Sequence, residues 1–154
     1  MANKIALITG ATSGIGEGCA RRFAQGGYDL ILTGRNTGKL ETLKKELEAR
    51  EGIKVLALAF DIRNREAAKK AVDYIPESMK NIDVLINNAG LARGLEPEYE
   101  GDFEDWDQMI DTNIKGLLTM TRLIVPRMIA RNHGHVINIG SVAGDAAYAG
   151  GNVY

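Results

Sequence analysis

The sequence predicts an α/β domain in which parallel strands alternate with helices. Short apolar runs recur along the chain, and each is followed by a stretch with the spacing of an amphipathic helix. The 18 glycines, against 3 prolines, gather at the ends of the apolar runs, where a chain needs tight turns or close approach of its backbone to a ligand. Strict alternation of the two patterns favours a parallel sheet with right-handed crossovers.

Length and charge fit one domain spanning 1–154. The chain has 154 residues, of which 25% are charged and 45% hydrophobic, as in ordinary globular proteins. Its net charge is −1, and no basic stripe is present to follow a phosphate backbone. Nucleic acid is therefore not expected as a partner.

Cysteine content and hydropathy point to a cytoplasmic protein. The single cysteine, Cys19, excludes an internal disulfide and a cysteine-based zinc site, and no metal site is predicted. The longest apolar run, Val55 to Phe60, is far shorter than the ~20 residues that span a bilayer. No signal peptide is expected, because the first periodic segment begins at Lys4.

The first strand, 4–9, is apolar at nearly every position, so it belongs in the middle of the sheet with helices on both faces. A helix follows and ends at Gly26-Gly27, where a glycine C-cap would lie. Its expected inner face comprises Ile15, Cys19, Ala20 and Phe23. The second strand is 28–33.

The same cycle is repeated over the next fifty residues. Leu40, Leu43 and Leu47 mark the second helix, and 54–60 is the third strand. Asn64 is the expected N-cap of a third helix. The inner face of that helix comprises Ala68, Ala71, Val72 and Ile75. The fourth strand is 82–86.

The longest helix is expected to begin after an N-cap at Asp102 and to kink or end early at Pro126. Its expected inner face comprises Trp106, Met109, Ile110, Leu117, Met120 and Ile124. The helix carries apolar residues on more than one side, including Met109, Leu118, Leu123 and Ile129. Such a helix is covered by a second layer or by a partner subunit. The fifth strand is 135–139, and 142–154 is expected to be a loop.

The turn after the first strand carries the strongest chemical signal. Residues 9–16 read Thr-Gly-Ala-Thr-Ser-Gly-Ile-Gly and lead directly into a helix. Glycines there let the backbone approach a pyrophosphate, and the helix N-terminus offers free N–H groups. The alternative is an empty tight turn.

Other polar residues also follow strand ends, where open parallel sheets bind ligands. Asp61 either contacts the ligand or forms a loop or helix cap. Of Asn87 and Asn88, one is expected to be a turn residue. Asn113 lies on an otherwise apolar helix and needs a buried partner or a water. His133 and His135 precede the fifth strand at the opposite edge and are expected to take no part.

Five ordered motifs together resemble the short-chain dehydrogenase/reductase family. They are the Thr-Gly-x-x-x-Gly-x-Gly turn at 9–16, Asn-Asn-Ala-Gly at 87–90, Asn-x-x-Gly at 113–116, Ser141 and Tyr154. The resemblance implies a Rossmann-type doubly wound parallel sheet with strand order 3-2-1-4-5. It also implies further C-terminal strands and helices beyond residue 154.

The resemblance implies reversible hydride transfer between a nicotinamide cofactor and a carbonyl or alcohol substrate. Tyr154 would exchange the proton at the substrate oxygen, Ser141 would hydrogen-bond that oxygen, and Asn113 would hold a water in a proton relay. The cofactor-binding residues that it implies are Gly10, Thr12, Ser13, Gly14, Ile15, Gly16, Arg35, Asp61, Ile62, Asn87, Ala89 and Gly90.

The residues at the end of the second strand predict which nicotinamide cofactor is preferred. NAD-specific proteins of this fold place an acid there, whereas this chain has Gly34 followed by Arg35, whose guanidinium suits a 2′-phosphate. NADP(H) is therefore predicted, although Ser13 stands where the family often has a second basic residue.

The substrate expectation comes from two stretches that resemble the NADP-dependent 3-hydroxy acid dehydrogenases of the serine or allo-threonine type. These are residues 138–154 and 87–92. Arg93 is the nearby cation, and a surface position is expected for it. A 3-oxoacyl carrier-protein reductase and a non-catalytic NADP-binding protein remain as alternatives.

The resemblance also bears on assembly and completeness. Related enzymes pair the long helix across an interface, which predicts a homodimer or homotetramer. In the family, a lysine four residues after the tyrosine lowers the tyrosine pKa. The sequence stops at Tyr154, so the chain is expected to be the N-terminal part of a longer protein and inactive alone.

Overall fold

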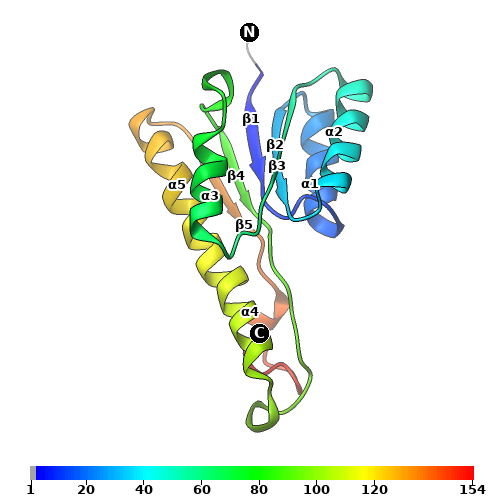
Figure 1. Cartoon of the computed structure of the whole chain (residues 1–154), viewed down its shortest axis with the longest axis vertical. Helices are drawn as coiled ribbons and strands as arrows, with labels where there is room; N and C mark the ends of the chain where they lie inside the picture. Colours follow the sequence, from blue (N-terminus) through cyan, green and yellow to red (C-terminus); the bar gives the residue numbers. More distant parts are fainter. Residues whose placement is uncertain (1–2) are drawn as a thin grey trace.

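A computed structural model of the chain describes residues 3–154 and shows one five-stranded parallel sheet (Figure 1). The strands are β1 (Ile5–Ile8), β2 (Asp29–Gly34), β3 (Val55–Ala59), β4 (Val84–Asn87) and β5 (His135–Asn138). Their order, β3-β2-β1-β4-β5, confirms the predicted topology. All four residues of β1 are buried, as its apolar sequence predicts.

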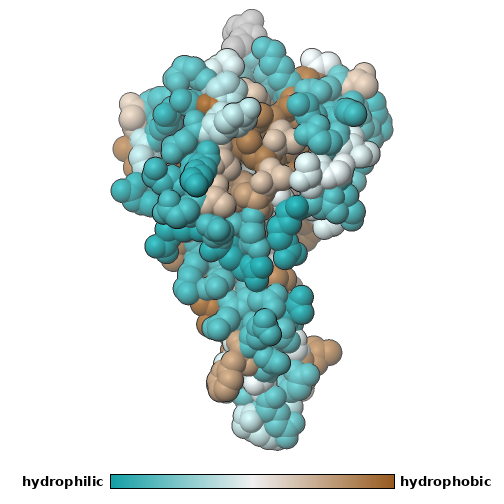
Figure 2. Space-filling view, viewed as in Figure 1, coloured by the Kyte–Doolittle hydropathy of each residue, from teal (hydrophilic) through white to brown (hydrophobic). Residues whose placement is uncertain are grey.

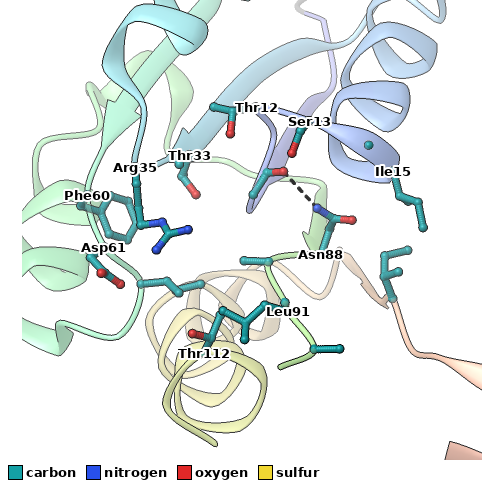
Figure 3. A pocket seen from close by; sticks show the side chains of 18 of the residues that line it. Thr12, Ser13, Ile15, Thr33, Arg35, Phe60, Asp61, Asn88, Leu91 and Thr112 are labelled. Atoms are coloured by element: carbon teal, nitrogen blue, oxygen red, sulfur yellow. Dashed lines mark hydrogen bonds between the residues drawn. The ribbon is translucent and has the colours of Figure 1, made fainter. Parts of the chain in front are cut away.

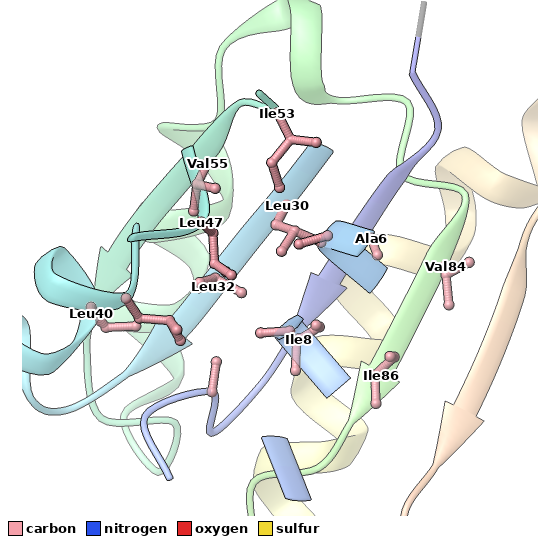
Figure 4. Close-up of a cluster of buried hydrophobic side chains, with 14 residues drawn as sticks. Ala6, Ile8, Leu30, Leu32, Leu40, Leu47, Ile53, Val55, Val84 and Ile86 are labelled. Atoms are coloured by element: carbon pink, nitrogen blue, oxygen red, sulfur yellow. The ribbon is translucent and has the colours of Figure 1, made fainter. Parts of the chain in front are cut away.

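Helices cover both faces of the sheet. α1 (Gly14–Gln25) and α2 (Thr37–Glu51) pack on one face, and α3 (Arg65–Asp73) and α5 (Leu117–Ala130) pack on the other. Because successive side chains of a strand point to opposite faces, β1 contributes to two cores. Ile8 belongs to the core beneath α1 and α2 (Figure 4), whereas Leu7 belongs to the core beneath α3 and α5.

Side-chain caps fix where several helices begin. The side-chain Oδ1 atoms of Asn36 and Asn64 accept hydrogen bonds from the N–H groups of Lys39 and Ala67, and Asp102 caps α4 (Phe103–Met109) in a similar way. The predicted caps at Asn64 and Asp102 are confirmed. Short 3₁₀ turns occur at Glu77–Met79, Glu98–Glu100 and Val142–Gly144.

The long helix differs from its prediction in two respects. A π-helical turn, Ile110–Gly116, joins α4 to α5. The expectation that Pro126 ends the helix early is wrong, because α5 continues to Ala130. Proline removes one hydrogen bond, while Ile124 and Met128 on either side remain buried in the core and hold the helix in place.

Several burial predictions need correction. Ile15, expected on the inner face of α1, is 64% exposed. Of the apolar residues named for a second side of the long helix, Leu118 and Ile129 are exposed, whereas Leu123 packs partly against the core. Met109 is buried, as expected for the inner face. Trp106, Ile110 and Leu117, expected on its inner face, are only partly buried.

Beyond the carboxyl ends of the strands the molecule narrows into an extension. It is formed by α4, the segment before α4 and the residues that follow β5, with the C-terminus close to α4 (Figure 1). Hydrophobic side chains are exposed on this extension (Figure 2). Among the described helices, none is both long and apolar enough to cross a membrane.

Candidate functional site

The glycine-rich turn between β1 and α1 is shaped by close backbone contacts. Gly10 and Gly14 have φ values of 66° and 54°, which favour glycine. A β-carbon at Gly10 would lie 2.9 Å from Ala89 Cα, and one at Gly16 would overlap Gly10 O and Asn88 Nδ2. Ser13 makes no side-chain cap, so the first N–H groups of α1 remain available for an anion.

Thr9 and Asn88 tie this turn to the segment that follows β4. Thr9 Oγ1 accepts hydrogen bonds from the N–H groups of Asn88 and Ala89, both at 3.0 Å. Asn88 Nδ2 donates to Thr9 O at 2.9 Å and to Gly10 O at 3.1 Å (Figure 3). Asn88 is therefore a brace between two segments rather than a turn residue.

Asn87, the last residue of β4, joins the sheet to α5. Its Nδ2 donates to Thr121 Oγ1 at 3.0 Å and to Asn138 Oδ1 at 2.9 Å. Its Oδ1 is buried without a hydrogen-bond partner among residues 3–154. Since Asn88 is a brace, neither residue of the pair is the turn former that the sequence suggested.

The first cavity, of about 420 Å³, opens between the glycine-rich turn and the ends of β2 and β3 (Figure 3). Ten of the predicted cofactor residues line it: Gly10, Thr12, Ser13, Gly14, Ile15, Arg35, Asp61, Ile62, Ala89 and Gly90. The other two lie elsewhere, because Gly16 is buried behind the turn and Asn87 lines a second cavity. Thr33, Phe60 and Thr112 also line it and were not predicted from the sequence, whereas Asn88, Leu91 and Ala92 belong to the 87–92 stretch already singled out there.

Arg35 and Asp61 are the charged side chains on the described wall of this cavity. Arg35 extends from the end of β2 toward Phe60 and Asp61 (Figure 3). Asp61 pairs with Arg63, with Arg63 Nη2 at 2.6 Å from Asp61 Oδ2 and Arg63 Nε at 3.0 Å from each carboxylate oxygen. The Arg63 hydrogen bonds lower the pKa of Asp61, and the charge of Arg35 adds to this effect.

The second cavity, of about 330 Å³, brings together Asn113, Ser141 and Tyr154. The remainder of its wall is mainly apolar and includes Met109 and Leu117. No charged side chain is among the described residues that line it. The hydroxyl of Ser141 accepts a hydrogen bond from Ala143 N–H at 3.2 Å, which begins the turn after β5.

Asn113 finds its hydrogen-bond partner in the backbone of Leu91, which is half-buried like Asn113 itself. Its Oδ1 accepts from Leu91 N–H at 2.9 Å, and its Nδ2 donates to Leu91 O at 2.8 Å. Asn113 lies in the π-helical turn, a feature often found at functional sites. The segment after β4 is thus held at one end by Thr9 and at the other by Asn113.

The two cavities share part of their walls. Residues that line both are Ala89, Gly90, Leu91, Ile139, Gly140 and Tyr154. A long ligand in the first cavity can therefore present one end to Ser141 and Tyr154 in the second.

Other polar residues singled out from the sequence lie outside both cavity walls. His133 Nε2 lies 3.4 Å from Asp83 Oδ1, and His135 is exposed at the start of β5. Arg93 Nη1 lies 3.6 Å from Asp105 Oδ1. Within residues 3–154, no group of three or more metal-binding side chains is found.

Comparison with known proteins identifies close relatives over almost the whole chain. The family model for short chain dehydrogenase matches residues 4–154. The NADP-dependent 3-hydroxy acid dehydrogenase YdfG of Salmonella typhi is 53% identical over 150 residues, which cover 97% of this chain and 59% of the relative. Sulfoacetaldehyde reductase 2 of Chromohalobacter salexigens is 45% identical over 151 residues, with coverage of 97% and 59%.

Solved structures agree with the sequence matches. Serine dehydrogenase from Escherichia coli superimposes with a TM-score of 0.91 at 52% identity, covering 97% of this chain and 68% of that chain. Its closed form complexed with NADP+ gives 0.90 at 52% identity, with coverage of 97% and 59%. The chain thus spans 59% of the length of the first curated relatives that it matches.

Proposed function

Because this chain belongs to the short chain dehydrogenase family, we propose that it forms the cofactor-binding part and the proton-transfer wall of an NADP(H)-dependent oxidoreductase. The substrate proposed is a 3-hydroxy acid or 3-hydroxy amino acid and its oxo form. The observation that carries the proposal is the shared wall of the two cavities, which places Tyr154 beside both.

The residues of the first cavity fit a dinucleotide phosphate. Gly10 and Gly16 let the turn pack closely against its neighbours, Gly14 leaves open space beside the turn, and the uncapped start of α1 presents N–H groups to an anion. The proposed cofactor residues are the twelve predicted from the sequence, and Gly16 and Asn87 act by supporting the turn and the sheet. Arg35 is proposed to pair with the 2′-phosphate, which distinguishes NADP(H) from NAD(H).

The cofactor supplies or accepts the hydride when bound. Tyr154 is proposed to donate or accept the proton at the substrate oxygen, and Ser141 is proposed to hydrogen-bond the same oxygen. Asn113 keeps one acceptor position and one N–H beyond its bonds to Leu91, and these are proposed to hold a water for proton relay.

The substrate class rests on what the relatives are named for, namely 3-hydroxy acids and serine. The test is reduction of a panel of 3-oxo acids and acyl thioesters by the protein that carries this chain, followed through loss of NADPH or NADH absorbance. We expect turnover with NADPH and 3-oxo acids, and much less with NADH or with thioesters. Preference for thioesters would contradict the substrate proposal, and binding without turnover of any substrate would contradict the enzymatic one.

Assembly and location complete the proposal. Exposed Ile114, Leu118 and Ile129 on the long helix support pairing of this helix in a homodimer or homotetramer. The single cysteine supports a reducing, cytoplasmic setting. Light scattering at micromolar concentration tests the assembly, and a monomer would contradict it.

A further inference from the structure

Gly34, the last residue of β2, has no conformational reason to be glycine. It lies in a strand and is not among the glycines with positive φ. The space around it gives the reason, because a β-carbon there would lie 2.9 Å from Thr12 Cγ2. Carbon atoms in good contact are about 3.5–4.0 Å apart, so the methyl group of Thr12 excludes a side chain at position 34.

Thr12 is held in this position by its own segment. The preceding residue, Ala11, is fully buried, and its N–H donates to Thr33 O at 3.0 Å, which fixes the glycine-rich turn against the end of β2. The side chain of threonine is branched at Cβ and rotates little about χ1. To move the methyl group aside, Thr12 must therefore change its χ1 rotamer or the turn must shift.

Position 34 faces the first cavity beside Arg35. In proteins of this fold that are specific for NAD, an Asp or Glu at the end of the second strand hydrogen-bonds the ribose 2′-hydroxyl. The same carboxylate would repel a 2′-phosphate. An acid at position 34 would therefore favour NAD(H) over NADP(H), but its β-carbon would overlap the methyl group of Thr12.

We propose that Thr12 is a specificity-determining residue, because its γ-methyl group keeps position 34 a glycine and so keeps a carboxylate away from the nucleotide 2′-position. The cofactor half of this inference rests on the function proposed above. The steric half, namely that the Thr12 methyl group prevents a side chain at position 34, does not rest on that function. The two halves are tested separately.

Thermal unfolding without any cofactor tests the steric half. G34A is made in the wild-type, T12S and T12V backgrounds, since T12S removes only the overlapping methyl group and T12V keeps a branched side chain but removes the hydroxyl. We expect G34A to lower Tm by about 4–8 °C in the wild-type and T12V backgrounds, and by less than half as much with T12S. An equal loss in all three backgrounds would overturn the inference.

Fluorescence titration with NADPH and NADH tests the cofactor half. We expect T12S/G34D to bind NADH about tenfold more tightly than T12V/G34D, because only T12S leaves room for the carboxylate to reach the 2′-hydroxyl. T12S/G34D is also expected to bind NADPH less tightly than T12S. Equal NADH affinity in both backgrounds would overturn the specificity role.

Two further outcomes remain decisive. If T12V/G34D fails to fold while T12S/G34D folds, that difference itself supports the steric half. If the wild-type chain binds neither nucleotide, the proposed function and the specificity role both fail, while the G34A melting series still decides whether Thr12 excludes a side chain at position 34.

Discussion

Replacing Thr9 with valine removes one buried hydroxyl group from beneath the segment that both cavities share. Thr9 is 1% exposed, and its Oγ1 accepts from Asn88 N–H and Ala89 N–H, each at 3.0 Å. The hydroxyl also donates to Ile86 O at 3.3 Å, but that carbonyl keeps the N–H of Thr9 as a second donor at 3.0 Å. Valine therefore leaves two backbone N–H groups without an acceptor.

The size of the effect follows from those two groups. Each N–H left unpaired away from water costs about 1–3 kcal/mol, so Thr9→Val is expected to lower the free energy of unfolding by about 2–4 kcal/mol, since the segment is only partly buried. Thr9→Ser keeps the hydroxyl and loses one methyl group, at a cost of about 1 kcal/mol. Thr9→Val, although it preserves the shape of the side chain, is thus expected to lower the free energy of unfolding more than Thr9→Ser does.

Urea unfolding of the wild type, Thr9→Val and Thr9→Ser measures this difference directly. Loss of the two hydrogen bonds also frees the segment, so NADPH affinity is expected to fall more for Thr9→Val than for Thr9→Ser. A Thr9→Val protein as stable as Thr9→Ser would refute the role given to the hydroxyl.

Three further predictions concern charge and proton transfer. Arg35→Asp is expected to weaken NADPH binding at least tenfold and to spare NADH, whereas equal loss of both would contradict the proposed phosphate contact. Tyr154→Phe in the protein that carries this chain is expected to lower kcat by about 10²–10⁴ with little change in cofactor affinity, measured by turnover and titration. Because Arg63 lowers the pKa of Asp61, their pairing stabilises the fold above the ordinary aspartate pKa of about 3.9 and is lost as the pH falls through the lowered pKa. Arg63→Gln is therefore expected to flatten the loss of stability on acidification, and an unchanged profile between about pH 5 and pH 2 would contradict this.

The topology could be predicted because burial acts on long stretches of sequence. The run around Leu7 is apolar on both faces, and only a strand covered by helices on each side satisfies that pattern. The caps at Asn64 and Asp102 were also predictable, since the interaction lies within a few residues of each cap.

Features that depend on distant parts of the chain escaped prediction. Periodicity placed Ile15 in the core, whereas it is exposed at the mouth of the first cavity, where the start of α1 faces open space. The π-helical turn adds to the long helix a register change that no 3.6-residue pattern encodes. Thr33 and Phe60 line the first cavity but are ordinary strand residues in sequence, so only the folded sheet reveals them.

The π-helical turn and the glycine-rich turn serve the same short segment. Residues 88–91 lie beyond the end of β4, and within residues 3–154 no backbone–backbone hydrogen bond joins them to a neighbouring strand. Thr9 accepts from Asn88 N–H and Ala89 N–H, and Asn113 binds both backbone groups of Leu91. Motifs about 100 residues apart thus hold one peptide that forms a wall of both cavities. Substitution at either end is expected to disturb the cofactor side and the substrate side together, which distinguishes these positions from Arg35 and Ser141, each confined to one cavity.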